Sequence, residues 1–162
     1  HMRDPLKGFD CLIKVLKNGG FIKIGLYSEL ARESIVKIRE YIKKNNLKDS
    51  KENMRDLRLK ILKKPDLRNI LTWGDFYSMS TFKDLCFHEQ EHRFKIPEID
   101  NMIKNYNLKF LGFVFKNQKS REIYNSFYPH DTSQNNLTNW QIVEEKNTHI
   151  FADMYNFWLQ KY

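Results

Sequence analysis

Apolar residues recur with a helical period in several segments of the chain and gather into short runs in others. In residues 6–16 they fall three or four positions apart, which predicts a helix with one apolar stripe. Asp4 can cap this helix, and Pro5 suits its first turn because the missing N–H would be unpaired there. The glycine pair 19–20 is expected to end the helix, and the β-favouring run 21–27 predicts a strand.

The middle of the chain, residues 29–94, is dominated by helical patterns and aromatic residues. The predicted elements are helices at 29–45 and 48–62, a helical turn at 66–72, a loop or extended stretch at 76–78, and a short helix that Ser80 caps and that runs through Phe87. Ser50, three residues before Asn53, is the expected cap of the second helix. This segment is predicted to be a helical insert between two α/β units.

The C-terminal part alternates helix and strand again. The predicted elements are a helix at 96–106, a strand at 108–115, a short helix at 120–128, one or two helices at 138–154, and a final strand at 155–161. The fold class is therefore α/β, with a small mixed sheet of about three strands and a large helical insert. The 162 residues suit a single domain, 1–162.

Composition and charge bear on the partners and the cellular location expected for the chain. The net charge of +8 comes mostly from scattered lysines, so a nucleic-acid partner is not expected from charge patterning. No apolar run approaches the roughly 20 residues that a bilayer span needs, and the N-terminus lacks a signal-peptide layout. We therefore expect a soluble, cytoplasmic protein without a membrane partner. Cys11 and Cys86 are single and lie in apolar patterns, which predicts two buried free thiols.

Four motifs, taken in order, resemble one family. Residues 1–5, His-Met-Arg-Asp-Pro, resemble the segment that follows the fourth strand of class I S-adenosylmethionine-dependent methyltransferases. Residues 16–21, Leu-Lys-Asn-Gly-Gly-Phe, resemble the turn into their fifth strand, and residues 25–32 the passage that leaves it. The combination of Phe-Tyr-Ser at 76–78 with Phe-His-Glu-Gln-Glu-His-Arg-Phe at 87–94 is similar to an insert of methyltransferases that often accompany tetratricopeptide repeats.

This resemblance implies the C-terminal half of a Rossmann-like methyltransferase, whose complete form uses S-adenosylmethionine. The family's sheet order would place the strand 21–27 beside 155–161, running antiparallel, and 155–161 beside 108–115. The six glycines of the chain form no G-x-G turn, so the cofactor turn that the family carries after its first strand is absent from this sequence. We therefore expect weak cofactor binding and no activity from this chain alone, with the methyl acceptor open among small metabolites, sugars and protein side chains.

The resemblance also assigns candidate site residues. It places His1 near the cofactor, and it places the insert over the substrate, where His88 and His92 are the candidate catalytic bases. The candidate substrate-binding residues are Tyr27, Ser28, Tyr77 and Arg93. Tyr27 and Ser28 follow from the position at the end of a strand, which is the ligand-facing edge of open α/β sheets.

The sequence leaves two alternative functions open. One is a non-catalytic binding or interaction domain derived from a methyltransferase. The apolar outer edge of the strand 21–27 would lack its neighbour, and we expect it to be covered by a second copy of the chain in a homodimer or by rearranged helices. The other is a zinc hydrolase, because residues 88–92 match H-E-x-x-H. A short helix, the charge of Glu91 and the lack of an obvious third ligand argue against zinc, and no metal site is expected.

Overall fold

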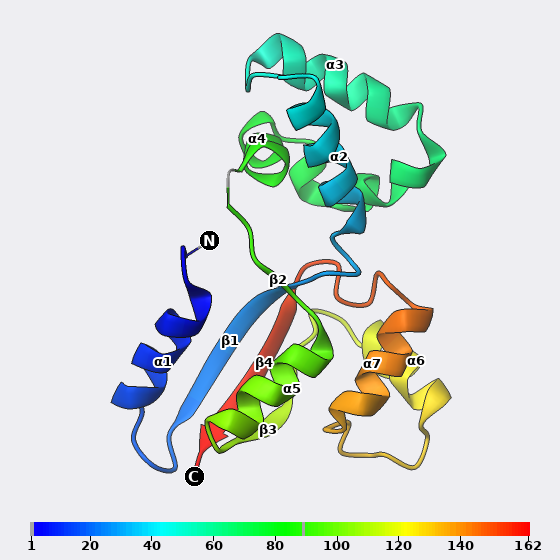
Figure 1. Ribbon diagram of the computed structural model, residues 1–162. Coiled ribbons are helices and arrows are strands. Elements are labelled where there is room, and N and C mark those ends of the chain that lie inside the picture. The colour runs from blue at the N-terminus through cyan, green and yellow to red at the C-terminus, as the bar shows by residue number, and fades with distance from the viewer. Residues whose placement is uncertain (1, 89) are drawn as a thin grey trace. The chain divides into compact units, whose positions relative to one another are not determined.

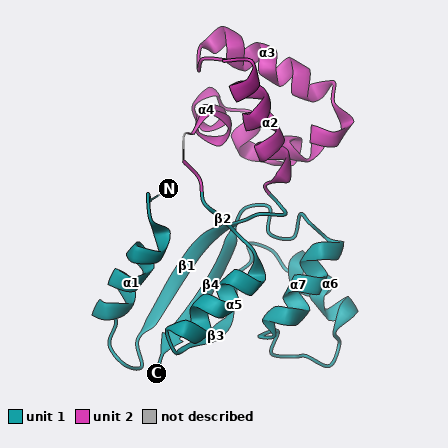
Figure 2. Cartoon of the chain, viewed as in Figure 1, with its two compact units in different colours: residues 1–31, 92–162 teal, residues 32–91 magenta. Residues whose placement is uncertain are grey.

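The structure is a computed structural model that describes residues 2–88 and 90–162 (Figure 1). The chain divides into two compact units (Figure 2). Unit 1 comprises the residues up to Ala31 together with His92–Tyr162, and unit 2 comprises Arg32–Glu91. Among the described residues, each helix is too short or too polar to cross a membrane.

Unit 1 is built on a mixed sheet of four strands. The strands are β1 (Phe21–Ser28), β2 (Arg93–Phe94), β3 (Leu108–Phe113) and β4 (Tyr155–Lys161), in the order β2-β1-β4-β3. Strand β4 runs antiparallel to both of its neighbours, so β1 and β3 are parallel to each other. The predicted α/β class is confirmed, as is the predicted placement of the last strand between the other two.

The prediction of about three strands is wrong because it missed β2. This strand has only two residues, and Arg93 and Phe94 pair in parallel with Tyr27 and Ser28. Two residues are too few to show the alternation by which a strand is recognised in sequence. Within the described ranges, no strand pairs with the remainder of that edge of β1.

One face of the sheet carries the core of unit 1. Helices α1 (Pro5–Val15), α5 (Ile96–Asn105) and α7 (Leu137–Lys146) pack on it with their apolar stripes, and α6 (Lys119–Phe127) adds Tyr124. Strand β4 shows most clearly how buried and exposed side chains alternate along a strand. Tyr155, Phe157 and Leu159 are fully buried, whereas Trp158 between them is 41% exposed.

The N-terminal helix begins as predicted and ends earlier than predicted. The carboxylate of Asp4 accepts a hydrogen bond of 3.1 Å from the backbone N–H of Lys7, and Pro5 occupies the first helical position. The helix stops at Val15 because Leu16 is already extended. Gly19 instead shapes the following turn with a φ of +76°, and its N–H donates to the carbonyl of Lys161 on β4.

Unit 2 is helical. Its elements are α2 (Glu33–Lys44), α3 (Lys51–Leu62), the 3-10 helices η1 (Pro65–Thr72) and η2 (Gly74–Phe76), and α4 (Met79–Phe87). Its interior is made of large side chains with almost no exposure, among them Ile35, Ile38, Ile61, Ile70 and Phe82. Ser50 caps α3 as predicted, accepting from the N–H of Asn53 at 3.2 Å.

Several predicted boundaries are wrong. Helix α2 begins at Glu33 rather than at residue 29, because the N–H of Ala31 donates to Ser28 Oγ and the chain turns there. Helix α4 begins after Ser78 and not at Ser80, and the stretch predicted as loop or extended includes the end of η2. Residues 148–152 are turns rather than a second helix. Cys86 is buried as predicted, but Cys11 is exposed on α1.

Candidate functional site

The carboxyl end of β1 brings several of the candidate residues together. Tyr27 and Arg93, both predicted to bind substrate, are opposite each other in the parallel pair of β1 and β2. Ligands of open α/β sheets bind beyond the carboxyl ends of the strands, because the connecting segments diverge there and leave a crevice. The short strand β2 therefore carries part of the predicted insert motif to the carboxyl end of β1.

The side chain of Ser28 points into the protein from this same end. Its hydroxyl donates to Glu144 Oε1 at 2.5 Å, and Tyr155 OH lies 2.7 Å from both oxygens of that carboxylate. All three side chains are buried, and they link α7 to the end of β1 and the start of β4. Burial raises the pKa of the Glu144 carboxyl above its usual value, although the two hydroxyl donors oppose that shift.

Sequence reasoning missed Glu144 and Tyr155 as partners of Ser28. A usable signal was present, because Glu144 follows Trp140 by four positions and therefore lies on the apolar stripe of its helix. A carboxylate on a buried stripe needs hydrogen-bond donors, and these two hydroxyls provide them.

A hollow of about 690 Å³ lies next to β2 in unit 1, and we call it the β1-end hollow. Its lining consists of Arg3, Asp4, Pro5, Leu6, Lys7, His92, Arg93, Phe94 and Glu98. It thus joins two of the predicted site residues, His92 and Arg93, to the beginning of α1. The structure brings these residues together from segments that are nearly 90 positions apart in the sequence.

The remaining candidates lie elsewhere. Tyr77 belongs to unit 2, is 67% exposed, and donates from its hydroxyl to the carbonyl of Leu71. His88 also belongs to unit 2, and its Nδ1 accepts from the N–H of Gln90 at 3.2 Å. His1 lies outside the described residues, so its assignment to the cofactor stays a prediction.

The described residues of the H-E-x-x-H segment, 88 and 90–92, are not in the helix that zinc binding by this motif needs. Helix α4 ends at Phe87, and His88 is already extended with φ −63° and ψ 131°. Two histidines four positions apart share a metal only when a helix places them one turn apart on one face. Within residues 2–88 and 90–162, no group of three or more His, Cys, Asp or Glu side chains is arranged to hold a metal ion.

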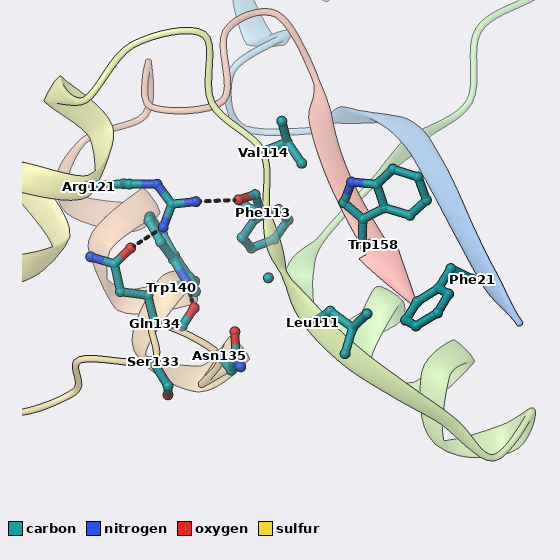
Figure 3. A pocket seen from close by; sticks show the side chains of 11 residues that line it. Phe21, Leu111, Phe113, Val114, Arg121, Ser133, Gln134, Asn135, Trp140 and Trp158 are labelled. Carbon is teal, nitrogen blue, oxygen red and sulfur yellow. Dashed lines mark hydrogen bonds between the residues drawn. The ribbon is translucent and has the colours of Figure 1, made fainter. Parts of the chain in front are cut away.

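A second hollow in unit 1, of about 510 Å³, lies at the edge strand β3 and has lining residues on both sides of it (Figure 3). Phe21, Leu111, Val114 and Trp158 form an apolar side, and Arg121 with Gln134 forms a polar side. Arg121 donates to the Gln134 side chain at 2.6 Å and to the Phe113 carbonyl at 3.1 Å. Because its polar groups already bond to one another, this hollow is mainly an exposed apolar surface. The sequence prediction contains none of its residues as a site.

In comparisons with known proteins, no protein-family model matches the chain and no curated protein sequence matches it significantly.

Proposed function

We propose that this chain is the C-terminal, substrate-side portion of a class I S-adenosylmethionine-dependent methyltransferase. The observation that carries the proposal is the strand arrangement of unit 1. Parallel β1 and β3 flank antiparallel β4, which is the order and direction that the resemblance implies for the last three strands of such a domain. Each of the two parallel strands is preceded by a helix, α1 or α5, on the same face of the sheet.

The bare sheet face agrees with this proposal. In complete doubly wound α/β sheets both faces are covered, because crossover helices pack on each of them. Here the covered face holds the core, whereas Phe21 and Trp158 on the other face are 59% and 41% exposed. A doubly wound domain contains further strands and helices that would bury this surface.

In the complete domain, S-adenosylmethionine would supply an activated methyl group to a nucleophile of the acceptor. The role of this chain would be to bind and orient the acceptor at the β1-end hollow, since catalysis by positioning can account for much of such a reaction. His92, at the hollow, is the candidate that could accept a proton from the acceptor near neutral pH. The cofactor itself needs a glycine-rich turn and a ribose-binding carboxylate that this sequence lacks.

Calorimetry tests the proposal on two proteins. The 162-residue chain is expected to show no binding of S-adenosylmethionine, whereas the product of the complete reading frame around it is expected to bind. Failure of that product to bind the cofactor would overturn the proposal, and so would micromolar binding by the chain alone, since the cofactor turn would then be unnecessary.

The second candidate is a non-catalytic interaction domain that descends from a methyltransferase. The exposed apolar side of the hollow in Figure 3 favours it, because such patches mark interaction surfaces. The coding sequence ahead of residue 1 discriminates between the two candidate functions. A segment with a strand, a G-x-G turn and a helix ahead of residue 1 favours the enzyme, and a natural start codon at Met2 favours the interaction domain.

A further inference from the structure

We propose that the β1-end hollow binds a small organic anion through a carboxylate or phosphate group. As a statement about the methyl acceptor, this inference rests on the proposed function, but the binding itself does not depend on it. The site is a concave space of about 690 Å³, within the size range of small-molecule sites, and it lies where the parallel pair β1 and β2 ends.

The charges of the hollow favour an anion. Arg3, Lys7 and Arg93 line it against two carboxylates, those of Asp4 and Glu98. Arginine presents a planar set of donors that matches a carboxylate or phosphate in two parallel hydrogen bonds. Arg3 and Arg93 come from the two separate segments of unit 1 and line the same hollow, so one oxyanion could contact both guanidinium groups.

Both carboxylates accept a backbone hydrogen bond at the N-terminus of a helix. Asp4 accepts from the N–H of Lys7 at the start of α1, and its pKa is lowered by that hydrogen bond. Glu98 accepts from the N–H of Lys95 at 2.6 Å at the start of α5. Each helix N-terminus is equivalent to roughly half a positive charge, so it offsets part of the carboxylate beside it. Lys7 Nζ also lies 3.5 Å from Asp4 Oδ2, so these two charges pair with each other. Arg3 and Arg93 then face the single remaining carboxylate, that of Glu98.

The other basic hollows fit an anion less well. The hollow of Figure 3 has one basic side chain among the described residues that line it, Arg121, so it does not offer a pair of arginines. In unit 2, a hollow of about 460 Å³ has lysines at its rim, including Lys64, but its floor is apolar. The hollow of unit 2 provides a matched control, because the residues that line it include lysines but no arginine.

The test is a titration of the isotopically labelled chain, followed by ¹H–¹⁵N NMR, with inorganic phosphate, succinate and the neutral analogue succinamide. Ionic strength is held constant with NaCl so that general screening does not change. We expect saturable shifts at the amides of Arg3, Arg93 and Glu98 with at least one of the two anions and none with succinamide. The stronger of the two anions identifies the group that the hollow prefers.

Variants locate the binding. Arg93→Gln and Arg3→Gln are each expected to raise the Kd about tenfold, the effect of losing one charge-assisted hydrogen bond. The control Lys64→Gln is expected to leave the Kd unchanged within about twofold. Arg3 is exposed and precedes the first helix, so its variant remains informative if Arg93→Gln fails to fold.

The inference is overturned if neither anion gives saturable shifts at these amides, if succinamide gives the same shifts, or if both arginine variants behave like Lys64→Gln. The cofactor experiment has separate outcomes. Anion binding here without cofactor binding by the complete reading-frame product would refute the methyltransferase and keep the anion site. The reverse result would keep the enzyme and refute the anion site.

Discussion

The two faces of the sheet in unit 1 are built from alternate residues of the same strands, yet they differ completely in their surroundings. On the covered face, Phe157 has no exposed surface and its ring lies 5.8 Å from that of Phe113. On the bare face, the next residue, Trp158, leaves 41% of its surface exposed. Strand alternation favours a polar residue at an exposed position, so Trp158 makes this part of the bare face more apolar than alternation predicts.

The covered face is apolar except for one buried cluster of polar side chains. Ser28 and Tyr155 point into the core side of the sheet and meet the buried carboxylate of Glu144. A buried carboxylate is costly unless its oxygens are hydrogen-bonded, and here three hydroxyl contacts satisfy it. The comparison therefore separates a face that is covered, including its polar groups, from an uncovered face on which Phe21 and Trp158 lie beside polar residues such as Lys23 and Gln160.

The largest effect is expected from breaking the covered face. Phe157→Ala should lower the free energy of unfolding by about 3–5 kcal/mol, because a fully buried ring is lost and its cavity remains. Trp158→Ala, one residue away, should cost less than about 1 kcal/mol, since its ring is partly in water already. Urea denaturation measures both, and equal costs would contradict the distinction between the faces.

A smaller loss of stability is expected from removing the carboxylate of the buried polar cluster. Glu144→Ala leaves the hydroxyls of Ser28 and Tyr155 without their acceptor in the core, which should cost about 1–3 kcal/mol. The neighbouring Glu145→Ala is the control, because Glu145 is exposed and should change stability by less than about 0.5 kcal/mol. If the two variants are equally stable, the buried cluster does not hold α7 to the sheet.

The same carboxylate predicts a pH dependence. Its pKa is raised in the folded protein from a reference of 4.5, so the folded state holds the proton to a higher pH than the unfolded state does. The contribution of Glu144 to stability is therefore full below pH 4.5 and is lost as the pH rises through the folded-state pKa. Relative to Glu144→Gln, the wild-type chain should lose stability in urea denaturation as the pH rises above 4.5. A difference between the two that does not change with pH would contradict the raised pKa.

The covered face was predictable from sequence to a large extent. The spacing of Ile99, Met102 and Ile103 identified α5, and the run that contains Leu108 and Phe113 identified β3, because periodicity depends on burial against one core. The pairing of the strands was also predictable, but only through the resemblance to a family, since periodicity carries no information about which strands are neighbours.

The candidate site was less predictable. His92 and Arg93 were identified as candidates, but their approach to Arg3 depends on the two-residue strand β2, which leaves no pattern in the sequence. Glu144 could have been found from its place on the apolar stripe of α7, but its partners could not, because Ser28 is 116 positions away and Tyr155 is 11. Hydrogen bonds across such separations follow from tertiary packing, which local rules do not describe.

The smallest effect on stability is expected from Trp158→Lys, which should change the free energy of unfolding by less than about 1 kcal/mol while altering association. If the bare face and the unpaired edge of β1 drive self-association, as predicted for a homodimer, the wild-type chain should show concentration-dependent dimers by light scattering. Trp158→Lys should weaken them, because a charge on the apolar surface opposes its burial. Leu59→Lys, at a residue of unit 2 that is 57% exposed, is the control and should leave them unchanged. A wild-type chain that stays monomeric at high concentration would show that the bare face is not covered by a second copy, and the surface would then be left for the remainder of a larger domain.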